Sequence, residues 1–114
     1  MIVFSSVFKK EFKRLYKRYN SLRKDLDEII SLLEKDPKHG IDLGYGVRKI
    51  RMSITSKNKG KSGGARIISY NYQVEDNGDI VLLTIYDKSE RSNISSKEIS
   101  QLIKQVRDSI GSNI

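Results

Sequence analysis

The stretch Ile80-Val81-Leu82-Leu83-Thr84-Ile85-Tyr86 is apolar at nearly every position. An unbroken apolar run of this length is typical of a central strand that is covered on both faces. Ahead of it, Asp76-Asn77-Gly78 predicts a tight hairpin turn, because Asn-Gly tolerates the positive φ angles that such turns need. A further strand, rich in Ile and Tyr, is expected over residues 66–74. The fold is therefore expected to centre on a β-hairpin.

Residues 47–54 switch to a period of two, which is the pattern of a strand with one buried face. Ile50, Met52 and Ile54 would point one way, and Lys49 and Arg51 the other. The strand is thus expected to display cations beside the hairpin. Residues 55–65, rich in Lys and Gly, are expected to be a loop.

The amino-terminal third has helical periodicity, after a short strand expected over residues 1–4. Ser5 or Ser6 is the expected N-cap, and Pro37 ends the helical region. Asn20-Ser21 offers a stop followed by a new N-cap, so we expect a hairpin of two helices rather than one long helix. The apolar positions are Phe8, Phe12, Leu15, Tyr19, Leu22, Leu26, Ile29 and Leu33.

The last element begins with a capping box in which Ser95 pairs with Glu98. An apolar stripe follows, containing Leu102 and Val106. The predicted order is strand, helix, helix, three strands of an antiparallel-rich sheet, helix. The 114 residues are expected to form one α+β domain over residues 1–114.

Composition narrows the possible chemistry. The chain has no cysteine and a single histidine, His39, which we expect to be a loop residue. Disulfides, thiolate sites and histidine-rich metal sites are therefore excluded, and no metal cofactor is expected. No apolar run approaches the roughly 20 residues that span a bilayer. A cytoplasmic protein without membrane contact is expected.

Charge gives the first indication of a partner. Lys and Arg number 22 against 14 Asp and Glu, giving a net charge of +8. A surplus of this size favours a polyanion such as nucleic acid. The first helix is basic, although such a run on its own is more often a solvated face.

One tempting motif fails. Gly60-Lys61-Ser62 looks like the end of a nucleotide-binding P-loop, but the first glycine of that motif would fall at Thr55. A strand also follows where a helix should, so no nucleotide cofactor is expected.

Cations from three predicted strands and a loop are expected at one edge of the sheet. Such a groove suits a phosphodiester backbone, and Tyr70, Tyr72 or Tyr86 could stack on exposed bases. Alternatively, these rings could pack within the core. For Tyr70 and Tyr72 we favour core packing over base stacking. The cations are Lys49, Arg51, Lys57, Lys59, Lys61, Arg66, Lys88 and Arg91.

Three segments taken together resemble the RelE/HigB toxins of the RelE/ParE superfamily, and the HigB branch most. They are Gly46-Val47-Arg48-Lys49-Ile50-Arg51, then Lys59-Gly60-Lys61-Ser62-Gly63-Gly64-Ala65-Arg66-Ile67-Ile68, then Leu82-Leu83-Thr84-Ile85-Tyr86-Asp87-Lys88-Ser89-Glu90-Arg91. They match G-x-R-K-I-R, G-K-x-G-G-x-R-x-I and L-L-T-I-Y-x-K-x-E over roughly positions 46–95. Each motif alone is weak, but the set is specific.

The resemblance implies the toxin of a type II toxin–antitoxin system, silenced by a cognate antitoxin. Members bind the ribosome and cut mRNA in its A site, which inhibits translation. The RNA's own 2′-hydroxyl attacks the adjacent phosphate, so the protein must deprotonate that hydroxyl, neutralise the phosphate and protonate the leaving oxygen. A metal-independent endoribonuclease without a cofactor is implied.

The resemblance also suggests roles for individual residues. Arg66 is expected to hold the phosphate, because its planar fork binds two oxygens at once. A lysine among Lys49, Lys59 and Lys61 is the expected general base, if neighbouring cations favour its deprotonation. The expected catalytic residues are Arg66, Lys49, Lys61, Tyr86 and Lys88, and the expected RNA-binding residues are Arg48, Arg51, Lys57, Lys59 and Arg91.

The sequence departs from RelE at two positions. Ser89 stands where RelE has a further arginine, and Ser95 where a tyrosine is expected. Tyr86 or a rearranged cation must then substitute, or cleavage depends more on ribosomal RNA.

Two other functions remain open. A ParE-like toxin shares this fold but inhibits DNA gyrase, and a non-enzymatic protein could use the same groove only to bind RNA. Whether the toxin is of the RelE/HigB type or the ParE type, an antitoxin is expected. It would cover the basic groove or pack on the last helix near Leu102 and Val106.

Overall fold

The computed structural model describes residues 1–57, 63–72 and 78–111. It confirms the predicted α+β class and the predicted order, with one strand added. The elements are β1 (Ile2–Phe4), α1 (Ser6–Tyr16), α2 (Leu22–Lys35), β2 (Ile41–Gly44), β3 (Val47–Met52), a 3-10 turn (Thr55–Lys57), β4 (Ala65–Tyr72), β5 (Asp79–Asp87) and α3 (Ser96–Gly111).

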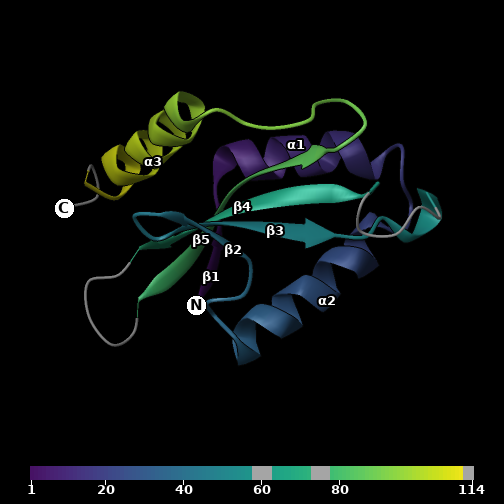
Figure 1. Ribbon diagram of the computed structural model, residues 1–114, viewed down its shortest axis with the longest axis horizontal. Coiled ribbons are helices and arrows are strands. Elements are labelled where there is room, and N and C mark those ends of the chain that lie inside the picture. The colour runs from purple at the N-terminus through teal and green to yellow at the C-terminus, as the bar shows by residue number, and fades with distance from the viewer. Residues whose placement is uncertain (58–62, 73–77, 112–114) are drawn as a thin grey trace.

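The strands form one sheet in the order β1-β5-β4-β3-β2. The pairings are antiparallel except for β1, which runs parallel to β5. Strand β5 is an interior strand between β1 and β4, as its apolar sequence predicted, and is buried from Ile80 to Asp87. The predicted turn at residues 76–78 lies mostly outside the described residues. Figure 1 shows α1 and α2 running along the sheet, while α3 follows β5 after a long connection.

Two apolar cores lie on opposite faces of the sheet. Helices α1 and α2 pack on the first face, where Leu15 and Leu33 meet Ile50 and Ile85. Helix α3 packs on the second face, where Leu102 belongs to the same core as Val81, Leu83 and Tyr86. The apolar stripe of α3 is thus intramolecular core, and each fully buried side chain of this size contributes about 1.5–3 kcal/mol.

The start of each helix and the end of α2 agree with the prediction, but α1 ends at Tyr16, before the predicted stop at Asn20. Ser5 caps α1, since its Oγ accepts from the Phe8 amide at 3.0 Å and donates to the Leu83 carbonyl at 2.8 Å. Ser95 caps α3 by accepting from the Glu98 amide at 3.1 Å. The Glu98 carboxylate does not complete the capping box, because it binds Arg91 instead.

Ser21 occupies the N-cap position of α2 but does not cap it with its side chain. Its hydroxyl donates to buried Asp25 at 2.8 Å. Asp25 also accepts from the amide and hydroxyl of Thr55, at 3.0 and 2.6 Å. This carboxylate therefore ties the first turn of α2 to the segment that follows β3.

Within the described part of the chain, no helix has the length and apolar character needed to cross a membrane.

Candidate active site

Three strands bring two arginines and a phenol into one row across the sheet. Arg51 of β3 pairs with Arg66 of β4, and Arg66 pairs with Tyr86 of β5. Directly opposed residues have Cβ atoms about 4.5–5.5 Å apart, so the three side chains share one environment. They lie on the face where α3 packs, since Tyr86 belongs to that core and Arg51 alternates with Ile50 and Met52 of the first core.

The Tyr86 hydroxyl is buried beside these cations. The residue is 4% exposed, and its hydroxyl has no hydrogen-bond partner among the described residues. Burial raises the pKa of Tyr86, against the opposing effect of Arg66 and Arg91, so the phenol keeps its proton at neutral pH. Leaving such a group unpaired costs about 1–3 kcal/mol. A ligand that accepts its hydrogen bond would recover that free energy.

The charge of Arg66 is buried and lies close to the charge of Arg51. The residue is 4% exposed, and its guanidinium donates to its neighbour's carbonyl, Ala65 O, at 3.1 Å. Burial lowers the pKa of Arg66, and the nearby charge of Arg51 lowers it further. An anion bound between the two guanidiniums would relieve both effects, and a phosphate matches their geometry.

Gly64 brings the start of β4 against the end of β3. A Cβ at this position would lie 2.1 Å from the carbonyl oxygen of Met52, so no larger residue fits without moving the backbone. The Gly64 carbonyl also accepts from the Lys88 amide at 3.0 Å. The glycine therefore fixes the backbone from which Arg66 projects, two residues later.

Arg91 covers the phenol from the connection after β5. Its guanidinium carbon lies 5.4 Å from the centroid of the Tyr86 ring. Glu98 of α3 holds it through two hydrogen bonds of 3.1 and 2.8 Å. Lys88 is half-buried, and its Nζ donates to the Ser92 carbonyl at 3.2 Å. Arg91 therefore lies against the Tyr86 ring, whereas the described contact of the Lys88 side chain is with the connection that follows β5.

Lys49 extends the cationic face along β3, two residues from Arg51. Together they line a hollow of about 430 Å³ with His39, Gly40 and Ile41. The sequence predicted a loop position for His39, which is correct, but not its position beside two site cations. No local sequence motif indicated this position of His39. It depends on strand β2, which follows His39, and that strand was not predicted.

Arg48 and Lys57 do not join the row. Arg48 is paired with Ser69, one position out of phase with the row, and so faces the side of the sheet on which α1 and α2 pack, 3.9 Å from Asp42. The Lys57 side chain is only 10% exposed and contacts buried Asp87 at 2.8 Å. Strand alternation for Arg48, and a buried carboxylate for Lys57, thus place both side chains outside the row, and their RNA-binding role stays a prediction. Lys59 and Lys61 lie outside the described residues.

The buried carboxylate of Asp87 was not predicted from the sequence. It accepts from Tyr19 at 2.6 Å, from Lys57 at 2.8 Å, and from the amide and hydroxyl of Ser89 at 2.9 and 2.8 Å. Burial alone would raise the pKa of Asp87, but these hydrogen bonds outweigh it and hold that pKa well below its usual range. The network fixes the chain immediately after Tyr86. In the sequence, the buried carboxylate was indicated by a single Asp at the end of an apolar strand.

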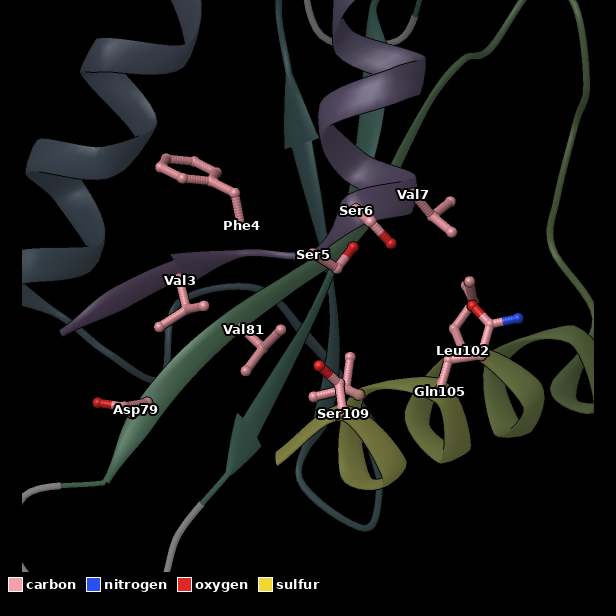
Figure 2. Close-up of a pocket in the computed structure, with 11 residues that line it drawn as sticks. Val3, Phe4, Ser5, Ser6, Val7, Asp79, Val81, Leu102, Gln105 and Ser109 are labelled. Carbon is pink, nitrogen blue, oxygen red and sulfur yellow. The ribbon is translucent and has the colours of Figure 1, made fainter. Parts of the chain in front are cut away.

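A second hollow lies away from the cations. Figure 2 shows it between the start of α1, strands β1 and β5, and helix α3, where Phe4, Val81 and Leu102 border it. Its volume is about 280 Å³, and no Lys or Arg is among its described lining residues. Nothing in it matches the expected phosphate chemistry.

No three His, Cys, Asp or Glu side chains gather into a metal-binding group in the part of the chain that the structure describes. The groups available at the row are therefore cations and one phenol. They can hold a phosphate between two guanidiniums and donate a proton or hydrogen bond from the phenol.

Comparison with protein families agrees with the predicted resemblance. A family model described as the RelE toxin of the RelE/RelB toxin–antitoxin system matches residues 5–110. The match spans all the elements of the row, and membership implies a cognate RelB-type antitoxin as partner. The chain therefore belongs to the RelE toxin family, the toxins of RelE/RelB toxin–antitoxin systems.

Proposed function

We propose that this toxin is a ribosome-dependent endoribonuclease that cuts mRNA in the ribosomal A site. The observation that carries the proposal is the row Arg51–Arg66–Tyr86, in which a buried phenol without a partner among the described residues lies beside two guanidiniums. These are the groups that phosphodiester cleavage needs around the reacting phosphate.

In the proposed reaction the 2′-oxygen forms a bond to phosphorus and the bond from phosphorus to the 5′-oxygen breaks. The products are a 2′,3′-cyclic phosphate and a 5′-hydroxyl. One proton leaves the 2′-hydroxyl and one is delivered to the 5′-oxygen, so no other reactant is needed.

Arg66 and Arg51 would hold the non-bridging oxygens, where negative charge develops in the transition state. This role fits the lowered pKa of Arg66, because a bound anion would offset the burial of its charge and the repulsion from Arg51. Tyr86 would donate to the leaving 5′-oxygen. Its raised pKa suits a donor, since the phenol stays protonated at neutral pH.

Lys49 is proposed as the group that accepts the 2′-hydroxyl proton, with Lys61, outside the described residues, as the alternative. Lys88 and Arg91 would hold the RNA backbone beside Tyr86. Arg91 is fixed by Glu98, so it would also keep the phenol in place.

The test is primer extension on a reporter mRNA in a purified translation system, with and without ribosomes. Wild type should cut only when ribosomes are present, and Arg66→Ala should not cut. Arg48→Ala, whose side chain faces away from the row, is the matched control and should keep most of the activity. Intact mRNA with a growth-arresting wild type would refute the proposal, and inhibition of gyrase supercoiling would then be measured.

A further inference from the structure

A buried ion pair joins the ends of the three strands that carry the row. Asp87 is the last residue of β5 and is fully buried. Its carboxylate accepts from Lys57 Nζ at 2.8 Å, and Lys57 ends the 3-10 turn that follows β3. The amide of the next residue, Lys88, donates to the carbonyl of Gly64 at 3.0 Å, one residue before β4. Residues 87 and 88 therefore connect β3 and β4 to the end of β5.

This ion pair lies on the opposite face of the sheet from the row. Asp87 follows Tyr86 along β5, and its ladder partner Ala65 belongs to the core under α1 and α2. Tyr19 of the same core donates to Asp87 at 2.6 Å, and its ring centroid is 5.3 Å from Lys57 Nζ. The pair therefore faces away from RNA bound at the row, so its effect on the reaction has to pass through the backbone.

Asp87 also orders the turn that follows β5. Its carboxylate accepts from the amide and hydroxyl of Ser89, and its carbonyl accepts from the amide of Arg91 at 3.1 Å. Lys57 Nζ adds a hydrogen bond of 3.1 Å to the Ser89 hydroxyl. The same residue that binds Lys57 thus fixes the turn from which Arg91 covers the Tyr86 ring.

The 3-10 turn that carries Lys57 is itself held in place. A second buried carboxylate, Asp25 of α2, accepts from the amide and hydroxyl of Thr55. The amide of Ser56 donates to the hydroxyl of Ser21 at 2.9 Å. Each of the three residues of the turn is therefore bonded to an element other than β3, and Lys57 reaches Asp87 from a fixed backbone.

Stability alone is a weak reason for such a pair. Apolar residues of similar volume often replace a buried ion pair without loss of stability, whereas removal of one partner leaves an uncompensated buried charge. Burial raises the pKa of Asp87, but the hydrogen bonds from Lys57 and Tyr19 outweigh it, so the carboxylate is charged at neutral pH. Separation of the pair would leave both charges uncompensated, and this keeps the strand ends together.

We propose that Lys57 and Asp87 are positioning residues for the row, because their ion pair holds together the ends of the three strands that carry it. Their role is to set the spacing of the two guanidiniums and the phenol. The inference rests on the proposed function, since it assigns both residues to the same reaction. A displacement of about 1 Å in a catalytic site can cost 10²-fold in rate. Loss of the pair should therefore slow the chemical step without weakening the binding of ribosomes.

The test compares Asp87→Asn with the double variant Lys57→Met/Asp87→Asn, each at a temperature where circular dichroism shows it folded. The single variant leaves Lys57 without its counter-charge, so both its urea midpoint and its cleavage rate should fall. The double variant removes both charges, so its urea midpoint should return close to that of wild type. Its single-turnover rate at saturating ribosomes should still be at least about tenfold below wild type, with an unchanged half-saturating ribosome concentration. A wild-type rate in the double variant would show a purely structural pair and overturn the proposal.

The matched control is Arg23→Met/Asp27→Asn, which removes one positive and one negative charge from an exposed ion pair of α2. Its urea midpoint, cleavage rate and half-saturating ribosome concentration should equal those of wild type. An equal loss of rate in this control would show a general effect of charge removal and would also overturn the proposal.

A second readout needs no cleavage. The NMR signals of the Nε–H groups of Arg51 and Arg66 report the environment of the row in the free protein. They should shift in the double variant and keep their wild-type positions in the control. If the wild type leaves mRNA intact, the nuclease proposal fails, and these signals still decide whether the pair positions the row. Unchanged signals in the double variant would contradict the positioning role even if cleavage were slower.

Discussion

Arg51 on β3 is directly opposite Arg66 on β4, so two like charges share one position of an antiparallel ladder. Such a pair is destabilising in the free protein. Arg66 is also buried, and its lowered pKa reflects both effects. An arrangement that opposes folding but suits a bound phosphate is expected of a functional site.

Replacing the buried arginine should therefore separate stability from activity. Arg66→Met removes the buried charge and keeps much of the side-chain volume, so the free energy of unfolding should stay within about 1 kcal/mol of wild type. Cleavage should disappear, because the phosphate loses its forked donor. Urea denaturation and primer extension measure the two quantities. A loss of about 3 kcal/mol or more, with cleavage retained, would show that Arg66 is mainly structural.

Tyr86→Phe removes a hydroxyl that has no partner among the described residues. Stability should stay within about 0.5 kcal/mol of wild type, since no described hydrogen bond is lost. Cleavage should slow by about 10²-fold or more if the phenol is the proton donor. Single-turnover rates on programmed ribosomes measure the effect.

Tyr70→Phe is the matched control, on the same face of the same sheet. The Tyr70 hydroxyl accepts from Arg107 at 2.7 Å, so its loss should reduce stability by about 1 kcal/mol. Cleavage should be unchanged. Equal loss of activity in both tyrosine variants would contradict a specific role for Tyr86.

Acid should unfold the protein through Asp87. Its pKa in the folded state lies below the unfolded value of about 3.9, so folding favours the charged form. The stabilisation is complete above about pH 5 and is lost as the pH falls below about 4. Glu90 and Glu98, whose pKa values are also lowered by arginines, add smaller contributions because they are more exposed.

Asp87→Asn should lower the free energy of unfolding at pH 7 by about 3 kcal/mol, because it leaves Lys57 buried without its partner. Its stability should also fall less steeply between pH 4 and 2, measured by urea denaturation at each pH. Asp27→Asn, an exposed carboxylate 3.5 Å from Arg23, is the control and should behave as wild type. An unchanged acid dependence in Asp87→Asn would rule out this residue as its origin.

His39 lines the hollow with Lys49 and Arg51 but has no part in the proposed chemistry. His39→Gln should therefore keep the cleavage rate within about threefold of wild type. The measurement is the pH profile of single-turnover cleavage, compared between the variant and wild type. Loss of an acidic limb in the variant would make His39 the general base in place of a lysine.

Much of the fold could be predicted because its elements have strong periodicity. Local sequence pattern was enough to predict the apolar strand β5, the alternating strand β3 and the two amphipathic helices. Strand β2 was not predicted, because Ile41-Asp42-Leu43-Gly44 is short and both its apolar residues stay exposed. It exists through pairing with β3, and residue pattern alone does not encode that partner.

The row of the candidate site was only partly predictable. Alternation placed Lys49 and Arg51 on one face, but the opposition of Arg51, Arg66 and Tyr86 depends on strand register. Arg48 and Lys57 were placed among the RNA-binding residues because sequence gives charge without direction. Lys57 finds its partner Asp87 thirty positions away in the chain, a contact that only the tertiary fold creates.

The most direct test of the central claim uses a synthetic mRNA with one 2′-deoxynucleotide at the scissile position of the A-site codon. The all-ribose mRNA should be cut on the ribosome, leaving a 2′,3′-cyclic phosphate and a 5′-hydroxyl, and the deoxy mRNA should stay intact. Cleavage of the deoxy mRNA at the same position would contradict attack by the 2′-hydroxyl and with it the role proposed for the Arg51–Arg66–Tyr86 row.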